Sequence, residues 1–312
     1  MTDHRMTPPA ISLTHLDNLW IQVSGTLCNI ACAHCFNSSG PNVRTFDHLS
    51  REAVRDAIDA AARRGVREIF FTGGEPFLNP HLLEMLEWSL AIAPTTVLTN
   101  GMLIGDRTAD RLAALERPSA YSFEIRVSLD GYTEAMNDAI RGRGVFRQAL
   151  AAIARLSRRG LLPLVTIVRT WPDEDEAATL AGFMRVLREA GDLRPRVKIL
   201  PALPLGREPA RAPGPGAGGL VTTEMLDGFD RDLLMCSNSR VVTDRGIWVC
   251  PLLVEQPDAR LGATLDEAAT SYPLRHAACV SCWQYGTICG NISAQIDGPD
   301  TVHASPAAAP RP

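Results

Sequence analysis

Three cysteines near the start of the chain are spaced so that they could hold an iron–sulfur cluster. Cys28, Cys32 and Cys35 form a C-x3-C-x2-C pattern directly after an apolar run that predicts a β-strand. Cysteine thiolates are the usual ligands of four-iron clusters, which take four ligands. Three thiolates leave one iron open, and an open position in a metal site is normally where a substrate or cofactor binds. The alternative is a zinc loop or three unrelated thiols.

Five further cysteines lie near the other end of the chain, and none lies between positions 35 and 236. Two of them form a C-x2-C pair, which by itself often indicates zinc. Disulfides are rare in a reducing compartment, so the gathering of cysteines at both ends favours two metal sites. The five residues are Cys236, Cys250, Cys279, Cys282 and Cys289.

A second motif, Gly73-Gly74-Glu75-Pro76, follows an apolar run that predicts another strand. Consecutive glycines let the backbone approach a ligand and leave its N–H and C=O groups uncovered. Together with the Glu75 carboxylate, these groups suit an ammonium ligand. Taken alone, the four residues predict only a tight turn, as does Asn100-Gly101 after the next strand.

Polar residues that suit a nucleoside or a carboxylate follow a later strand. Ser128 and Asp130 occupy alternating positions, so both point to one side of that strand. A hydroxyl and a carboxylate at these positions suit ribose or carboxylate contacts. Arg141 could pair with a carboxylate through two parallel hydrogen bonds, and Arg143 is an equal candidate by position.

Alternating strands and helices would bring these motifs together. Ser50 caps a predicted helix that runs to about residue 64, with Glu52 in its first turn and Gly65 after its end. Further helices are predicted over 80–92, from 106, over 145–159 and over 174–190. Strands are predicted near residue 19 and within 67–76, 95–101, 121–131, 162–170 and 196–206. This alternation predicts parallel βα units, and six strands are fewer than the eight of a closed barrel.

Composition and charge exclude several classes of protein. The chain has 312 residues, of which 46% are hydrophobic, enough for a sizeable core. A formal charge of −4 lacks the positive excess that is typical of nucleic-acid-binding proteins. There is no apolar run of ~18–20 residues and no signal-peptide pattern, so we expect a cytoplasmic protein without membrane contact. Residues 1–15 and 294–312 are expected to be disordered, and the Pro-, Gly- and Ala-rich segment within 207–222 is expected to be a linker.

The cysteine loop, followed about forty residues later by GGEP at the end of the second strand, resembles the radical S-adenosylmethionine (SAM) enzymes. The resemblance covers roughly residues 19–205. It implies an α/β fold with a partial (βα)6 barrel over 16–206. It also implies that Cys28, Cys32 and Cys35 bind a [4Fe-4S] cluster whose open iron chelates the amino and carboxylate groups of SAM. The remaining SAM contacts would come from His34 at the adenine, and from Gly73, Gly74, Glu75, Pro76, Ser128, Asp130 and Arg141.

The second cysteine group looks like the SPASM and twitch extensions of the same enzymes, which bind auxiliary iron–sulfur clusters. We therefore expect a small cysteine-rich domain over 223–293. A full SPASM domain has seven cysteines and two clusters, whereas five cysteines look closer to the twitch type. One auxiliary cluster would be held by Cys236, Cys250, Cys279 and Cys282. Cys289 is then a spare ligand, an inert thiol or a hydrogen-atom donor, and the last role would make the enzyme an epimerase.

The resemblance implies an oxidoreductase or epimerase that takes electrons from a donor such as flavodoxin or ferredoxin. SAM would be cleaved to a 5′-deoxyadenosyl radical, which removes a hydrogen atom from the substrate. We expect oxidation or epimerisation of a small natural product such as an aminoglycoside sugar. Modification of a ribosomal peptide is the alternative, and cyclisation of GTP ranks last. From a different class, the chain could be a non-catalytic electron carrier or a zinc-binding adaptor.

Overall fold

The computed structural model describes residues 8–172, 175–212, 219–286 and 303–304. A ten-stranded sheet forms the centre, with strand order β10-β9-β8-β2-β3-β4-β5-β6-β7-β12. Six consecutive strands of this sheet are parallel, which confirms the partial barrel of six βα units. They are β2 (Asn18–Gln22), β3 (Glu68–Thr72), β4 (Thr95–Thr99), β5 (Phe123–Ser128), β6 (Leu164–Val168) and β7 (Arg196–Leu200).

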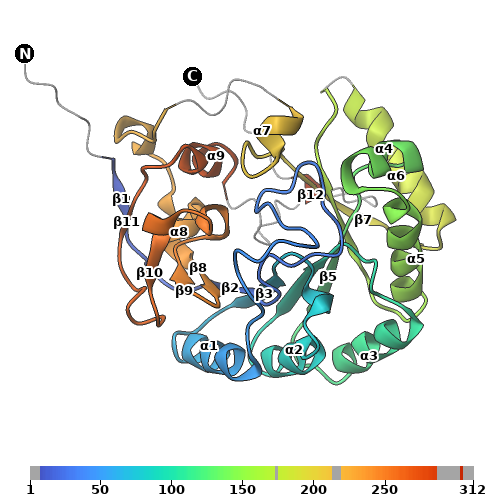
Figure 1. Ribbon diagram of the computed structural model, residues 1–312, viewed down its shortest axis with the longest axis horizontal. Coiled ribbons are helices and arrows are strands. Elements are labelled where there is room, and N and C mark those ends of the chain that lie inside the picture. Colours follow the sequence, from blue (N-terminus) through green and yellow to red (C-terminus); the bar gives the residue numbers. More distant parts are fainter. Residues whose placement is uncertain (1–7, 173–174, 213–218, 287–302, 305–312) are drawn as a thin grey trace, which may run out of the picture.

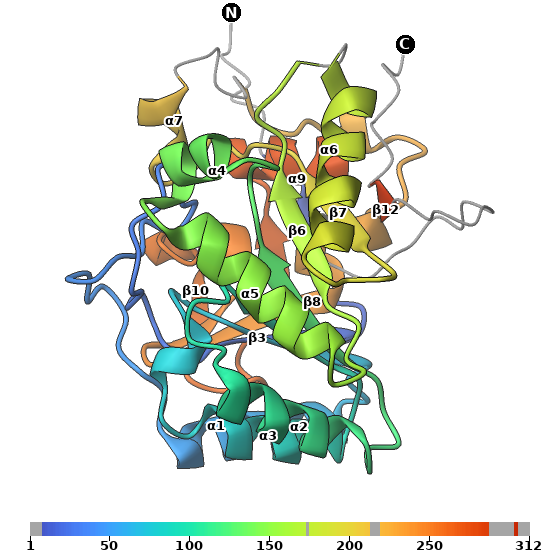
Figure 2. The same ribbon diagram turned by 90° about the vertical axis from the view of Figure 1, so that its right-hand side faces the viewer.

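Helices cover the outside of the parallel strands, along the lower and right-hand rim of Figure 1. In Figure 2, α1, α2 and α3 lie together at the bottom, while α4, α5 and α6 cover the side that faces the viewer. This places one layer of helices around one curved sheet. The helices are α1 (Arg51–Arg63), α2 (Leu82–Leu90), α3 (Asp106–Glu116), α4 (Glu134–Arg141), α5 (Val145–Ser157) and α6 (Glu176–Glu189).

The first helix illustrates why these segments fold as they do. The Ser50 side chain accepts a hydrogen bond from the Ala53 N–H at 3.1 Å, which caps α1 as the sequence predicts. Val54, Ile58 and Ala61 recur at helical spacing and are fully buried against the sheet. Alternate strand residues such as Ile69 pack into the same core, so the parallel strands are buried on their helix-facing side.

The sheet continues beyond the barrel into the C-terminal part of the chain. Strand β8 (Ser239–Thr243) pairs in parallel with β2, and β9 (Gly246–Trp248) and β10 (Arg260–Gly262) extend it in antiparallel fashion. On the opposite edge, β12 (His303–Ala304) pairs in parallel with β7. The expected domain limits remain predictions, but the cysteine-rich region shares its sheet with the barrel because β8 covers the free edge of β2.

Besides β12, which lies in the tail expected to be disordered, two further segments expected to lack order contain regular structure. Strand β1 (Ala10–Ile11) pairs with β11 (Tyr272–Pro273), and the Ile11 side chain is buried. Helix α7 (Glu208–Arg211) lies in the expected linker. Residues 1–7, 213–218 and most of 294–312 lie outside the described residues. No helix in the described part of the chain is long and apolar enough to cross a bilayer.

Short elements complete the C-terminal region, where helix α9 carries the C-x2-C pair. Around it, in the left part of Figure 1, lie α8 and the hairpin of β8 and β9. The helices are α8 (Met235–Asn238) and α9 (Ala277–Tyr285). The structure also contains the 3₁₀ turns η1 (Pro76–Leu78), η3 (Glu224–Leu226), η4 (Arg231–Leu233), η5 (Pro251–Leu253) and η6 (Pro257–Ala259).

Candidate active site

A cavity of about 190 Å³ opens where the carboxyl ends of the parallel strands meet the cysteine loop. Ligand sites of open α/β sheets lie at this end of the strands. The cavity brings together residues that are far apart in the sequence but were predicted to bind one cofactor. These are Cys28, Cys32, His34, Cys35, Gly73, Gly74, Ser128 and Arg141. Arg143, the other candidate for a carboxylate contact, is exposed on the surface.

The three thiols of this cavity are unpaired and suited to a cluster. Cys28 and Cys32 are buried and Cys35 is half-buried. The Asn100 side-chain amide lies 3.7 Å from the Cys28 sulfur, and the Arg141 guanidinium lies 3.8 Å from the Cys32 sulfur. Burial raises the pKa of the Cys28 thiol to about 12. Iron would have to displace this proton, and N–H donors beside the sulfurs are what tune a bound cluster.

The GGEP segment is packed against the cysteine loop. The Gly74 N–H donates to the Gly25 carbonyl and the Glu75 N–H donates to the Leu27 carbonyl, both at 2.9 Å. A Cβ atom at Gly74 would lie 2.2 Å from the Leu27 oxygen, and Gly73 has a φ of +136°. The sequence analysis assigned these glycines to the approach of a ligand. The structure adds that they also let two protein segments approach, while both still line the cavity.

Glu75 joins the GGEP turn to the end of strand β4. Its carboxylate accepts hydrogen bonds from the Thr99 hydroxyl at 2.7 Å and from the N–H groups of Asn100 and Phe77 at 2.8 and 3.2 Å. Burial raises the pKa of this carboxyl to about 7, and the three donors oppose the rise. A carboxylate has about four acceptor positions, so room for one further donor remains. Contact between Glu75 and a ligand ammonium remains a prediction, as does a ligand role for buried Pro76.

Replacing Gly74 with alanine should damage the cysteine loop. The new methyl group would overlap the Leu27 carbonyl, so we expect the free energy of unfolding to fall by about 3 kcal/mol. Iron bound by the N-terminal thiols should fall with it. Gly105→Ala is the matched control, because nothing lies within 4 Å of its Cβ position, and it should cost less than about 1 kcal/mol. Urea melts and iron assays would measure both effects, and equal behaviour of the two variants would contradict the packing argument.

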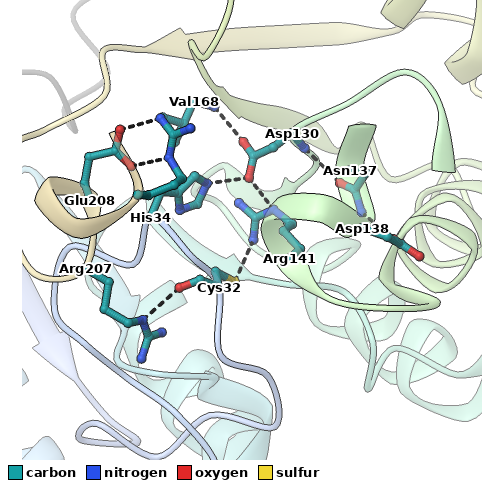
Figure 3. A network of polar contacts seen from close by, with 10 residues as sticks. Cys32, His34, Asp130, Asn137, Asp138, Arg141, Val168, Arg207 and Glu208 are labelled. Atoms are coloured by element: carbon teal, nitrogen blue, oxygen red, sulfur yellow. Dashed lines mark hydrogen bonds and ion pairs between the residues drawn. The ribbon is translucent and has the colours of Figure 1, made fainter. Parts of the chain in front are cut away.

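Asp130 ties together the two side chains that border the cavity beside Cys32. One carboxylate oxygen lies 2.6 Å from His34 Nε2 and 2.5 Å from Arg141 Nε. The other oxygen accepts a hydrogen bond from the Val168 N–H at 2.8 Å. Figure 3 shows the His34 and Arg141 side chains pointing toward the same oxygen. Burial alone would raise the pKa of Asp130, but the Arg141 charge and His34 together lower it to about 2.

This network changes the predicted role of Asp130. The carboxylate is completely buried, and both oxygens have protein partners. It therefore positions His34 and Arg141, whereas the sequence analysis assigned it to direct ribose or carboxylate contact. Ser128, two residues earlier, lines the cavity. Its contact with a ribose, and that of His34 with an adenine, remain predictions.

Arg207 is a site residue that the sequence analysis placed in a linker. Its guanidinium donates to the backbone carbonyls of Cys32 at 2.9 Å, Ser38 at 3.2 Å and Ser39 at 2.7 Å. Its backbone N–H donates to the Cys35 carbonyl at 3.0 Å. Arg207 thus holds the loop that carries the three thiols. The surrounding Pro- and Gly-rich composition masked this role, because nothing local in the sequence indicates a partner 175 residues away.

The second group of cysteines surrounds a smaller, apolar cavity. Its other walls are apolar side chains, among them Leu253, Leu274 and Ala278, with the Tyr272 ring. The thiols come from α8, from the segment that follows β9 and from α9. Four cysteines at most 7% exposed line it: Cys236, Cys250, Cys279 and Cys282.

The four thiols border one cavity. In the described part of the chain, no three Cys, His, Asp or Glu side chains meet closely enough to hold one metal ion. Structural zinc sites and four-iron clusters both take four thiolate ligands, so the four cysteines supply the ligand number of either. Burial raises the pKa of the Cys236 thiol, Cys282 and Cys279 add to the rise, and the Arg240 charge opposes it. Cys289, the expected catalytic thiol, lies outside the described residues.

One residue belongs to the walls of both cavities. Leu252, two positions after Cys250, lines the cavity of the N-terminal thiols as well as that of the C-terminal thiols. The first cavity is also bordered by the apolar side chains of Leu200 and Leu203. The two cavities therefore have this one wall residue in common.

Comparison with known proteins agrees with this geometry. The family model of the Radical SAM superfamily matches residues 23–181, about half of the chain. "Mycofactocin maturase MftC" of Mycobacterium tuberculosis (strain CDC 1551 / Oshkosh) is 35% identical over 173 residues, which are 54% of this chain and 42% of that protein. The chain thus spans less than half the length of this relative.

Two solved structures share the fold. "Native anSMEcpe with bound AdoMet" has a TM-score of 0.59 and 18% identity, over 80% of this chain and 79% of that chain. Streptococcus suis SuiB "bound to precursor peptide SuiA" has a TM-score of 0.61 and 15% identity, over 89% of this chain and 67% of that chain.

Proposed function

This chain belongs to the radical SAM superfamily, whose enzymes use a [4Fe-4S] cluster and SAM, and we propose that it uses this chemistry to modify a peptide. One observation carries the proposal. Three free thiols, the paired glycines and Arg141 border one cavity at the carboxyl ends of the barrel strands. The peptide part is supported by the fold shared with SuiB, which was crystallised with a precursor peptide.

The protein's own residues would bind and orient the reactants. The bound cluster and SAM would supply a one-electron cleavage of SAM and, through it, removal of a hydrogen atom from a substrate carbon. Arg141 would hold the SAM carboxylate by charge-assisted hydrogen bonds, with its side chain fixed by Asp130. The uncovered backbone of Gly73 and Gly74 would receive the ammonium. The apolar wall that includes Leu203 and Leu252 would exclude water from the reacting carbon.

A peptide substrate replaces the aminoglycoside sugar that the sequence analysis put first. A single auxiliary cluster does not by itself select between a sugar and a peptide. The SuiB comparison favours the peptide. Oxidation and epimerisation both begin with removal of a hydrogen atom, and epimerisation by Cys289 would involve a residue outside the described part of the chain.

The C-terminal thiols would hold an auxiliary cluster that takes an electron from the substrate radical. Leu252 supports this assignment, because its side chain borders both cavities. Loss of a hydrogen atom followed by loss of an electron and a proton removes two hydrogens from the substrate. The reaction would then be an oxidation, and the reductant of the first cluster remains a predicted flavodoxin or ferredoxin.

The proposal predicts SAM cleavage that peptides stimulate. Protein reconstituted anaerobically with iron and sulfide should release 5′-deoxyadenosine when SAM and dithionite are added, and should release none without dithionite. A random-sequence peptide library should increase this release more than a mixture of aminoglycosides does. Chromatography of the nucleoside measures both. Stimulation by aminoglycosides alone would overturn the peptide assignment, while no release at all would overturn the enzymatic one.

A further inference from the structure

Arg240 is a completely buried cation in strand β8, beside the C-terminal cysteines. Its guanidinium donates hydrogen bonds of 2.7–2.9 Å to four backbone oxygens, those of Ala268, Cys236, Ser239 and Thr270. These carbonyls accept from all three guanidinium nitrogens but leave the positive charge uncompensated. Removing a charge from water without an opposite charge costs several kcal/mol.

Within the described part of the chain, Arg240 lacks the carboxylate partner that Arg141, the other deeply buried arginine beside a thiol site, has. Arg141 has the Asp130 carboxylate at 2.5 Å. No carboxylate pairs with Arg240 among the residues that the structure describes. The chain therefore places a cation where its own described side chains provide no carboxylate.

The missing negative charge is available in the neighbouring cysteine cavity. Arg240 donates to the backbone oxygen of Cys236, one of the four cysteines that line the cavity. A four-iron cluster with four thiolate ligands carries a net charge of about −2, and one-electron reduction makes it more negative. A fixed cation beside such a cluster stabilises both the bound cluster and, more strongly, its reduced form.

We infer that Arg240 is the counter-cation of the auxiliary cluster and raises its reduction potential. This inference rests on the auxiliary cluster of the proposed function. A higher potential makes the cluster a better acceptor for the electron that a substrate radical gives up. Arg240 would thus be a positioning residue for the electron step, acting through charge rather than through contact with the substrate.

The test separates the effect of the Arg240 charge on the cluster from the effect of its hydrogen bonds. Arg240→Lys keeps the charge but cannot reproduce the fork of hydrogen bonds, whereas Arg240→Gln removes the charge. Both would be made in full-length Cys28/Cys32/Cys35→Ala protein, so that only the C-terminal site can bind a cluster. Arg275→Gln is the matched control, because Arg275 is exposed and already paired with Asp258 at 3.1 Å. Iron content and the midpoint potential, followed by electron paramagnetic resonance, are the measurements.

We expect Arg240→Gln to shift the potential to more negative values or to lose the cluster, while Arg240→Lys stays close to the parent and Arg275→Gln is unchanged. Full iron and an unshifted potential in Arg240→Gln would overturn the inference. So would equal loss in the lysine and glutamine variants, because hydrogen bonding would then explain both. A parent protein without C-terminal iron would also overturn it, while 5′-deoxyadenosine release by the wild type would show that SAM cleavage stands independently.

Discussion

Replacing Cys28, Cys32 and Cys35 together by alanine should abolish SAM cleavage and reduce the iron content from roughly eight to roughly four atoms per chain. The three thiols line one cavity with Arg141 and the paired glycines, so no other described cysteine can take their place there. The four C-terminal thiols line a separate cavity and should keep their cluster. Iron and sulfide assays after anaerobic reconstitution, with nucleoside chromatography, would measure both effects.

A Cys279/Cys282→Ala variant is the matched control for the triple variant. It should lose about four irons as well, yet still cleave SAM with dithionite, because the N-terminal site is intact. Wild-type protein with only about four irons, all lost in the triple variant, would show that the C-terminal cysteines hold no cluster. Zinc or free thiols would then take the place of the auxiliary cluster.

Replacing Asp130 with asparagine should be the most damaging single change near the cavity. The substitution leaves the Arg141 charge buried without its partner at 2.5 Å, and losing one member of such a pair costs about 3 kcal/mol or more. SAM should also bind about tenfold more weakly, since Arg141 is no longer held in place. Denaturant unfolding measures the first effect and equilibrium binding of SAM to the reconstituted protein measures the second.

Glu134→Gln provides the control for Asp130→Asn. Glu134 pairs with Arg147 at 2.8 Å, but both side chains are exposed, so its loss should cost less than about 1 kcal/mol. Equal effects of the two substitutions on the free energy of unfolding at neutral pH would show that burial of the Asp130–Arg141 pair is unimportant.

The stability that Asp130 contributes should also depend on pH. The pKa of Asp130 is lowered to about 2 from its ordinary 3.8. This contribution is therefore complete above pH 3.8 and is lost as the pH falls toward 2.

Local sequence signals were sufficient for the barrel and for the three-thiol loop. The Ser50 cap, the alternation of strands with helices and the C-x3-C-x2-C spacing each depend on residues close together in the chain. For the same reason, the position of Arg141 after β5 could be read as a carboxylate-binding arginine. The sequence positions did not decide between Arg141 and Arg143. In the structure Arg141 lines the cavity and Arg143 is exposed on the surface.

Other features depend on pairings that only the folded chain creates. Asp130 was predicted to contact the ligand because the sequence shows its carboxylate but not its partners. These partners, His34 and Arg141, lie 96 residues before it and 11 residues after it. Arg207 looked like part of a linker because of its Pro- and Gly-rich neighbours. The pairing of β8 with β2 was also missed, because a strand sequence does not state which edge it will join.

The β2–β8 pairing has a consequence for how the chain folds during synthesis. Strand β2 contains the eighteenth residue of the chain, and its partner Ser239 is made more than two hundred residues later. Contacts of such large sequence separation form slowly, and an unpaired strand edge can recruit other chains. The nascent barrel therefore has an uncovered edge until the C-terminal quarter leaves the ribosome. Slow translation or truncation before β8 should favour aggregation, and loading of the cluster beside Cys236 should follow closure of that edge.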